Sequence, residues 1–434
     1  MRVLFVSGEL IGGDLPYRLL EEGCDVKLYV EHPDQQDSQS GFVPKTDDWR
    51  RELDWVGKTG LIAFDDVGFG AIQDELRQAG YRVYGGSLGG DRLELDREFA
   101  QTMFSSLGLD VLPTHRFEHP AEAAQHILSA APARWVVKQN NHDSSLNYVG
   151  VFEDGSDVVE ILASYQNSGV REVSVQRAAD GIEIAVGRFF NGRDWVGPIE
   201  LNVEHKALCD GDIGPKTGEM GNLAWYTDDE AQPLFHKVLH PLRSYLTQHD
   251  FRGDIDVNCF VNGNKVVPIE ITARLGCPMV HVQGALHLTP WKELLSAIAE
   301  GRNLEVDYRR GFGIGLTVAV PPFPYRDKID ERYSAVGYPV RFKVEPSFDE
   351  WQRHYHFESV QRVLGSNGKS TLCVTNGLGY VAFVTGVGKT IEAARNETYA
   401  AARNLCIPKS IYRTDIGRKF IEKDRMALKD WGWI

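Results

Sequence analysis

The sequence has few cysteines, and no two of them have the spacing of a metal or redox motif. Six occur among 434 residues, none in a CxxC pattern: Cys24, Cys209, Cys259, Cys277, Cys373 and Cys406. A zinc site or a disulfide framework is therefore not expected, and free thiols fit a reducing cytoplasm. The chain also has no signal peptide and no apolar run long enough to span a bilayer, so we expect no membrane partner.

Positive charge is scarce as well. The 47 Lys and Arg residues are outnumbered by 61 Asp and Glu residues, which gives a formal net charge of -14. General binding to nucleic acid or to anionic membranes requires a basic surface that this balance does not supply. We expect small-molecule substrates held in local basic pockets, and a monomer or small homo-oligomer. At about 150 residues per domain, the length leaves room for about three domains.

The stretch 251–279 carries acids where strands normally carry apolar residues. Two alternating runs, DIDVNCFV and KVVPIEI, flank an Asn-Gly-Asn segment that favours a tight turn. With a side-chain period of two, Asp254 and Asp256 share one face, and Glu270 shares a face of the partner strand with Thr272. Such carboxylates repel one another unless a cation lies between them, and hard oxygen ligands suit Mg²⁺ bridging to nucleotide phosphates. The alternative is an exposed hairpin with solvated acids.

Residues 1–93 alternate between strand and helix patterns, which predicts a parallel sheet with ligands beyond the carboxyl ends of its strands. The loop after the first strand, within residues 8–17, bears glycines that favour a close approach to a phosphate or carboxylate. It lacks GxGxxG, and a plain tight turn is the alternative. Further along, residues 281–300 have the spacing of one amphipathic helix, and strand patterns predominate from about residue 311.

Two further segments carry candidate phosphate ligands. Lys138 closes the apolar strand RWVVKQ and precedes a polar loop that is suited to closing over a nucleotide; simple exposure of the lysine to water is the alternative. Residues 204–221 read EHKALCDGDIGPKTGEMG and predict a long loop, which in a compact domain is usually functional or disordered. Within it, His205 and Lys206 are candidates to hold phosphate or a substrate carboxylate. A solvated insertion is the alternative.

The order of four motifs resembles one family. EHK, GDIGPKTGEMG, PIEITARLG and YRTDIG follow one another along the chain. Glycinamide ribonucleotide synthetases, also called phosphoribosylamine-glycine ligases, show DHK, GDxGPNTGGMG, EFNxRxGDPE and YRRDIG in the same order. The resemblance spans about residues 90–420, and it implies the α/β fold of the ATP-grasp superfamily.

The resemblance implies an N-terminal parallel α/β domain over 1–93, a core over 94–112 and 183–310, an ATP lid over 113–182, and a β-rich C-terminal domain over 311–434. It implies ATP and Mg²⁺ or Mn²⁺ as cofactors, and the family acts in purine biosynthesis. The implied catalytic residues are Arg274, Lys206 and His205. The implied nucleotide-binding residues are Arg97, Lys138, Gln176, Arg177, Ala178 and Glu183. The implied metal ligands are Glu270, Asp256 and Thr272. The implied substrate loop comprises Gly214, Pro215, Lys216, Thr217, Gly218, Glu219, Met220 and Gly221.

The sequence also departs from the family pattern. Arg97 stands where the family has a lysine, and Thr272 stands where it has a ligating asparagine, so Asp256 is expected to supply the missing ligand. The family loop GSGGREHAL after the first strand is replaced by VSGELIGGDLP. We therefore expect an ATP-dependent carboxylate-amine ligase that joins an amino acid to an amine through an acyl-phosphate. The alternatives are a paralogue with a different amine and a non-catalytic nucleotide-binding protein.

Overall fold

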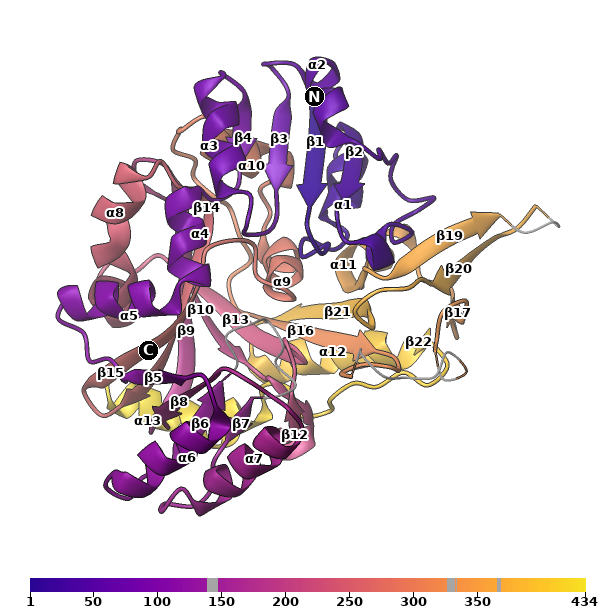
Figure 1. The fold of residues 1–434 in the computed structure, drawn as a ribbon. Coiled ribbons are helices and arrows are strands. Elements are labelled where there is room, and N and C mark those ends of the chain that lie inside the picture. Colours follow the sequence, from indigo (N-terminus) through magenta and orange to yellow (C-terminus); the bar gives the residue numbers. More distant parts are fainter. Residues whose placement is uncertain (139–146, 326–331, 333, 365–367) are drawn as a thin grey trace.

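The computed structural model describes residues 1–138, 147–325, 332, 334–364 and 368–434 (Figure 1). Its N-terminal part is a parallel sheet in the order β2-β1-β3-β4. The strands are β1 (Arg2–Ser7), β2 (Asp25–Val30), β3 (Leu61–Phe64) and β4 (Arg82–Tyr84), and the helices are α1 (Leu15–Glu21), α2 (Leu53–Val56) and α3 (Gly70–Gln78). Val3 and Phe5 join one buried cluster, whereas Leu4 and Val6 join another. Both faces of this sheet are therefore covered, as is usual for parallel strands.

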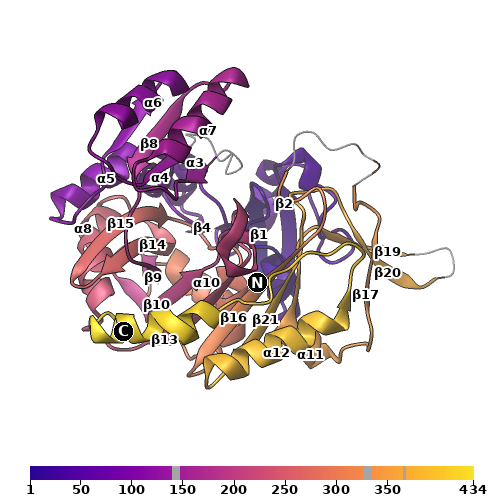
Figure 2. The ribbon, with the colours of Figure 1, turned by 90° about the horizontal axis from the view of Figure 1, so that it is seen from below.

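Two helices, α4 (Leu88–Leu95) and α5 (Arg97–Ser106), lead from this sheet to an antiparallel sheet in the order β5-β8-β6-β7. Its strands are β5 (Thr114–Phe117), β6 (Trp135–Lys138), β7 (Tyr148–Val149) and β8 (Val173–Arg177). The helices α6 (Pro120–Ser129) and α7 (Ser156–Asn167) pack on it around a small core of its own (Figure 2). We call residues 114–177 the small sheet unit.

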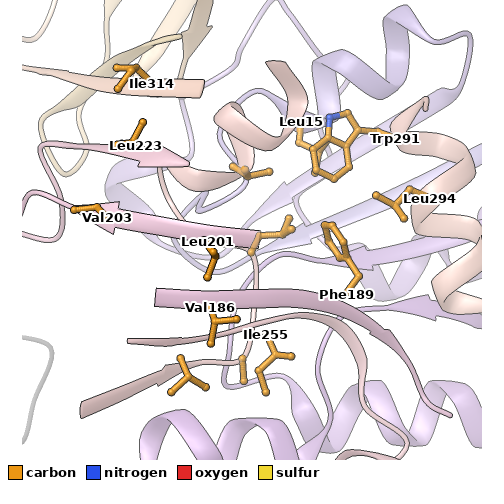
Figure 3. Close-up of a cluster of buried hydrophobic side chains, with 14 of the residues drawn as sticks. Leu15, Val186, Phe189, Leu201, Val203, Leu223, Ile255, Trp291, Leu294 and Ile314 are labelled. Carbon is orange, nitrogen blue, oxygen red and sulfur yellow. The ribbon is translucent and has the colours of Figure 1, made fainter. Parts of the chain in front are cut away.

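The largest sheet is antiparallel and has the order β15-β14-β9-β10-β13-β16-β21-β18. Its strands are β9 (Ile182–Asn191), β10 (Trp195–Glu204), β13 (Gly221–Thr227), β14 (Arg252–Asn262), β15 (Lys265–Thr272), β16 (Phe312–Ala319), β18 (Tyr355–Phe357) and β21 (Tyr380–Gly388). Strands from both sides of residue 310 thus share one sheet. Neighbouring strands of this sheet contribute buried side chains to one hydrophobic cluster, among them Val186, Leu201, Leu223 and Ile314 (Figure 3).

One helix expected over residues 281–300 is two helices in the structure. α9 (Met279–Leu286) ends before His287, whose backbone is extended, and α10 (Trp291–Ala299) begins after Pro290. Proline disfavours a helical conformation in the residue before it and has no N–H to donate, which explains the break. α8 (Arg243–Gln248) precedes β14.

The expected long loop over 204–221 is also more regular than its sequence indicates. β11 (Ala207–Cys209) and β12 (Ile213–Lys216) pair as a short antiparallel hairpin, with Gly211 at φ 73° in its turn. Glycine accepts this left-handed conformation without steric cost. The hairpin reaches toward the small sheet unit from the end of β10 (Figure 1).

The C-terminal part adds a further, smaller sheet. β19 (Val360–Leu364), β20 (Ser370–Val374), β17 (Pro339–Phe342) and β22 (Leu405–Cys406) form a sheet in that order, and the helices are α11 (Phe348–His354), α12 (Ile391–Asn404) and α13 (Arg425–Asp430). Trp433 is buried and donates its indole N–H to the carbonyl of Gly263 at 2.8 Å, which ties the C-terminal segment to the β14-β15 turn. Among the described helices, none has the length and apolar character needed to cross a membrane.

Candidate active site

A cavity of about 1970 Å³ lies between the small sheet unit and the largest sheet. The sequence-predicted residues that line it are Arg97, Lys138, Gln176, Arg177, Ala178, Glu183, His205, Lys206, Lys216, Thr217, Gly218, Glu270 and Arg274. The other predicted residues are described in the structure but are not among its lining: Gly214, Pro215, Glu219, Met220, Gly221, Asp256 and Thr272. Motifs far apart in the sequence therefore meet at one cavity.

Lys206 lies between two carboxylates at the end of the cavity nearest the largest sheet. Its Nζ is 3.0 Å from Oε2 of Glu204 and 3.3 Å from Oε2 of Glu270. The charge of Lys206 lowers the pKa of Glu270 to about 2, against the effect of burial. Burial alone would lower the pKa of Lys206, but the two carboxylates raise it well above its ordinary value. Both groups are ionised at neutral pH, so the site presents fixed charges of both signs.

The pairing of β14 with β15 determines which side chains lie next to Glu270. The register shifts between Asn258 and Cys259, so that Asn258 lies opposite Glu270 and Asp256 lies opposite Thr272. Without this bulge Glu270 would lie opposite Val257 and would point to the other face of the sheet, since opposed residues share a face. The bulge therefore places Glu270 on the same face as Asp256 and Asn258.

Asn258 was not predicted from the sequence, yet it is the direct neighbour of Glu270. Its Nδ2 donates to Oε2 of Glu204 at 2.9 Å, and its buried Oδ1 has no hydrogen-bond partner among the described residues. Asp256 lies two residues before Asn258 in β14, and its Oδ2 accepts from Asn202 at 2.9 Å. Burial and the charge of Glu204 raise the pKa of Asp256 well above its ordinary value. A cation beside Glu270 would thus meet the free Asn258 oxygen, a hard ligand of the type that Mg²⁺ prefers.

Arg274 has a partner that the sequence did not reveal. Its Nε donates to Oε1 of Glu94 at 3.2 Å, and Oε2 of Glu94 accepts from the backbone N–H of Ala273 at 2.7 Å. Burial raises the pKa of Glu94, although the charge of Arg274 opposes this. The two residues lie 180 positions apart. Only the spatial meeting of α4 with the end of β15 brings them together, so no local pattern could identify the pair.

Lys138 and Arg97 bring further positive charge to the cavity. Burial and the nearby charge of Arg97 lower the pKa of Lys138 to about 8. Gln176 donates its Nε2 to the carbonyl of Leu112 at 3.1 Å. Burial raises the pKa of Glu183, which faces the same cavity. The polar loop after Lys138, expected to close over phosphates, falls mostly on residues 139–146 and lies outside the described residues.

His205 connects the cavity wall to the YRTDIG segment. Its Nε2 accepts the backbone N–H of Gly417 at 3.2 Å, and burial lowers its pKa to about 4. The imidazole is therefore neutral at pH 7. Arg413 of the same segment is fully buried and pairs with Asp212 at 2.9 Å and with Asp415 at 2.8 Å. The YRTDIG motif thus contacts both the EHK and the GDIGPKTGEMG motifs directly.

Comparison with known proteins agrees with this geometry. A family model described as the phosphoribosylglycinamide synthetase, ATP-grasp (A) domain, matches residues 95–279. These residues form an ATP-grasp domain. The resemblance drawn from the four motifs is thereby confirmed, and the ATP-grasp domain contains most of the cavity lining.

Curated relatives that cover about 80% of the chain are phosphoribosylamine-glycine ligases. The phosphoribosylamine-glycine ligase of Streptomyces coelicolor is 27% identical over 354 residues, which cover 80% of each chain. That of Leifsonia xyli subsp. xyli is 28% identical over 364 residues, covering 80% of this chain and 81% of the relative. The solved phosphoribosylamine-glycine ligase of Thermotoga maritima has a TM-score of 0.67 at 21% identity, covering 96% of this chain and 100% of that one. An L-amino acid ligase from Bacillus licheniformis has a TM-score of 0.57 at 14% identity, covering 95% of this chain and 99% of that one. The expected α/β ATP-grasp architecture is confirmed.

Proposed function

We propose that this chain is an ATP-dependent carboxylate-amine ligase that activates an amino acid as an acyl-phosphate. The observation that carries the proposal is the meeting of Glu270 with Lys206 and Arg274 at one end of a cavity large enough for a nucleotide. The cations Lys138 and Arg97 line the same cavity and would face the triphosphate. We further propose that Gln176, Arg177 and Ala178 contact the adenine and that Glu183 lies near the ribose.

The reaction needs little besides positioning and charge neutralisation. The carboxylate attacks the γ-phosphorus of ATP, the bond to the bridging oxygen breaks, and ADP leaves. The charges of Lys138, Lys206 and Arg274 would stabilise the negative charge that spreads over the transferred phosphoryl group. Glu94 would orient Arg274 through its 3.2 Å contact. An amine then attacks the acyl carbon and displaces phosphate to form the amide.

The donor set fits a hard divalent cation such as Mg²⁺ or Mn²⁺. Glu270 is ionised, and the Oδ1 of Asn258 has no partner among the described residues on the same face of the sheet. We propose that these two oxygens hold the metal, with Asp256 and Thr272 behind them. The bound metal would neutralise phosphate charge. A related fold, the biotin carboxylase domain of a Hydrogenobacter thermophilus 2-oxoglutarate carboxylase, was solved with MgADP.

A matrix of amino acids and amines, read by ADP release with and without Mg²⁺, tests the function. The proposal predicts ADP only when ATP, the metal, a carboxylate and an amine are all present. Nucleotide binding by calorimetry without any substrate-dependent ADP release would instead identify a non-catalytic nucleotide-binding protein. Glycine with phosphoribosylamine, the pair in the names of the relatives, belongs in the matrix together with other amines.

A further inference from the structure

Three side chains of the types that bind transition metals meet outside the lining of the ATP-grasp cavity. Asp14 closes the loop after β1, His281 lies on α9, and His356 lies on β18. All three are buried, and none of them lines the cavity described above. Oδ1 of Asp14 is 3.4 Å from Nδ1 of His281 and 3.1 Å from Nδ1 of His356. Three segments that are far apart in the sequence therefore contribute to one cluster.

The separations within this cluster fit a single metal ion. Ligand atoms bound at about 2.0 Å in a tetrahedral site lie roughly 3.3 Å from one another. The ligand atoms of the three residues all lie within 4.8 Å of one another, and two of the separations are 3.1 and 3.4 Å. Two imidazoles and one carboxylate form a donor set that suits Zn²⁺ and other first-row divalent ions.

The hydrogen bonds of His356 direct a lone pair of the ring into the cluster. The hydroxyl of Thr385 donates to the carbonyl of Arg353 at 2.7 Å, so its oxygen accepts from Nε2 of His356 at 3.0 Å. A neutral imidazole with its proton on Nε2 has a lone pair on Nδ1. Nδ1 then faces an oxygen of Asp14 at 3.1 Å, and two lone pairs repel each other unless a cation lies between them. A second ring proton is the alternative, but it would place an imidazolium 3.2 Å from Nη2 of Arg18.

The neighbours of the cluster orient its side chains as the outer shell of a metal site does. Arg18 donates from Nε to Oδ2 of Asp14 at 2.7 Å and from Nη2 to the carbonyl of Tyr355 at 2.7 Å. Oδ1 of Asp14 is thereby left to the cluster, while Thr385 fixes the ring of His356. Ligating carboxylates and histidines are usually held by such second hydrogen bonds. Because Arg18 already balances the charge of Asp14, binding would depend on the imidazole nitrogens, which favours Zn²⁺ over Mg²⁺.

A hollow of about 330 Å³ adjoins the cluster and is separate from the ATP-grasp cavity. Asp14, His281 and His356 are among the residues that line it. Glu21 and Phe348 also line the hollow, and both are exposed, so the hollow reaches solvent. A metal ion can therefore enter from solution, and water in the hollow can complete the coordination around three protein ligands.

We propose that Asp14, His281 and His356 bind one Zn²⁺ or a similar first-row divalent ion, with water from the hollow as a further ligand. The ion would connect the loop after β1 with α9 and β18. It would stabilise their packing, since this arrangement of ligands exists only in the folded chain. The proposal does not depend on the ligase function or on the Mg²⁺ site at Glu270. The cysteine pattern gave no indication of the site because none of its ligands is a cysteine.

Metal binding to the full-length protein tests the proposal without any turnover assay. The protein is depleted with a chelator and titrated with Co²⁺ in excess Mg²⁺, which occupies sites built from oxygen ligands. About one Co²⁺ per chain should bind, with the visible absorption of a tetrahedral ion and no thiolate bands, and Zn²⁺ should displace it. Zn²⁺ should raise the Tm of the depleted protein by roughly 3 °C or more. Glu270→Gln should bind Co²⁺ as the unmodified protein does. Absence of stoichiometric binding in the unmodified protein would overturn the proposal and assign a second proton to His356.

Variants identify the ligands. His281→Ala and His356→Ala should each weaken Co²⁺ binding about 100-fold or more, and Thr385→Val should weaken it about 10-fold by releasing the ring of His356. His240→Ala is the control, because it removes an exposed histidine whose ring lies 5.5 Å from that of His236, the other place where two histidines could hold added metal. It should keep full affinity. Circular dichroism shows which variants are folded. Full affinity in a folded His281→Ala or His356→Ala variant, or loss of binding in His240→Ala, would overturn the proposal.

Discussion

The guanidinium of Arg274 is held 3.2 Å from Glu94, a residue of α4 that lies outside the strands of the site. If this contact orients Arg274 toward the transferred phosphoryl group, Glu94→Gln should reduce kcat about 100-fold, because small misplacements of positioning groups are costly. The KM for ATP should change much less, since Arg97 and Lys138 remain. Steady-state kinetics by ADP release measures both constants. Glu75→Gln, at an exposed acid in α3, is the control. A kcat within a factor of two of the unmodified protein would show that Glu94 is not needed.

Glu270 and Asn258 are the proposed metal ligands. Glu270→Gln should lower Mg²⁺-dependent ADP release by about 100-fold or more, because it removes the charged ligand beside the phosphates. Asn258→Ala should lower it about 10-fold to 100-fold and should raise the Mg²⁺ concentration that gives half-maximal rate. Titrations with Mg²⁺ at saturating ATP measure both effects. Glu122→Gln, exposed on α6, should behave as the unmodified protein does. An unchanged Mg²⁺ requirement in Asn258→Ala would remove Asn258 from the ligand set.

Nucleotide affinity should depend on pH through Lys138, whose pKa is lowered to about 8 by burial. Below pH 8 the ammonium is charged before ATP binds. Above pH 8 ATP must bind together with a proton, so its Kd should rise by up to about 10-fold per pH unit. Lys138→Arg keeps the charge at all accessible pH values and should remove this dependence. Calorimetry between pH 7 and 10 compares the two proteins. An equally steep rise of Kd in Lys138→Arg would assign the titration to another group.

Fold stability should depend on a buried carboxylate pair behind the site. Glu200 and Asp254 both accept hydrogen bonds from the Nε2 of Gln283, at 3.0 and 2.8 Å. Burial and mutual repulsion raise the pKa of Glu200 to about 8, and burial raises that of Asp254 to about 6. Both values exceed those of the unfolded chain, so the native state binds more protons between about pH 4 and 8. The free energy of unfolding should therefore fall as pH rises through this window.

Glu200→Gln removes the more strongly perturbed of these two acids. The free energy of unfolding of the variant should fall less between pH 6 and 8. At pH 8.5 it should be roughly 2 kcal/mol higher than that of the unmodified protein. Urea unfolding at several pH values provides the measurement. Glu160→Gln, at an exposed acid in α7, should leave the pH profile unchanged. If the free energy of unfolding fell more steeply with pH in Glu200→Gln, the carboxylate of Glu200 would be shown to stabilise the fold.

Much of the fold follows from local patterns. The alternation of strand and helix over residues 1–93 and the Asn-Gly turn before β15 are properties of short segments, and the structure contains the expected elements. The division of residues 281–300 into two helices was missed although Pro290 marks it, because the apolar periodicity continues on both sides. The hairpin of β11 and β12 was missed because its Gly and Pro content also fits an irregular loop.

At the site, the features that sequence reasoning missed are contacts between distant segments. A single extra residue in the β14-β15 pairing makes Asn258 rather than Val257 the neighbour of Glu270, and counting alternate residues cannot detect a bulge. The contact of Arg274 with Glu94 depends on how α4 packs against β15. Such contacts form only in the folded chain, whereas candidate residues such as Lys138 and Glu270 can be identified from the sequence itself.

Formation of an acyl-phosphate can be followed through the fate of the carboxylate oxygen. The best amino acid from the screen is labelled with ¹⁸O in its carboxylate and is incubated with ATP, Mg²⁺ and hydroxylamine. Each released phosphate should carry one ¹⁸O from the carboxylate, since that oxygen attacks the γ-phosphorus and leaves with it. Released phosphate without label would show that water attacks ATP instead and that no acyl-phosphate forms.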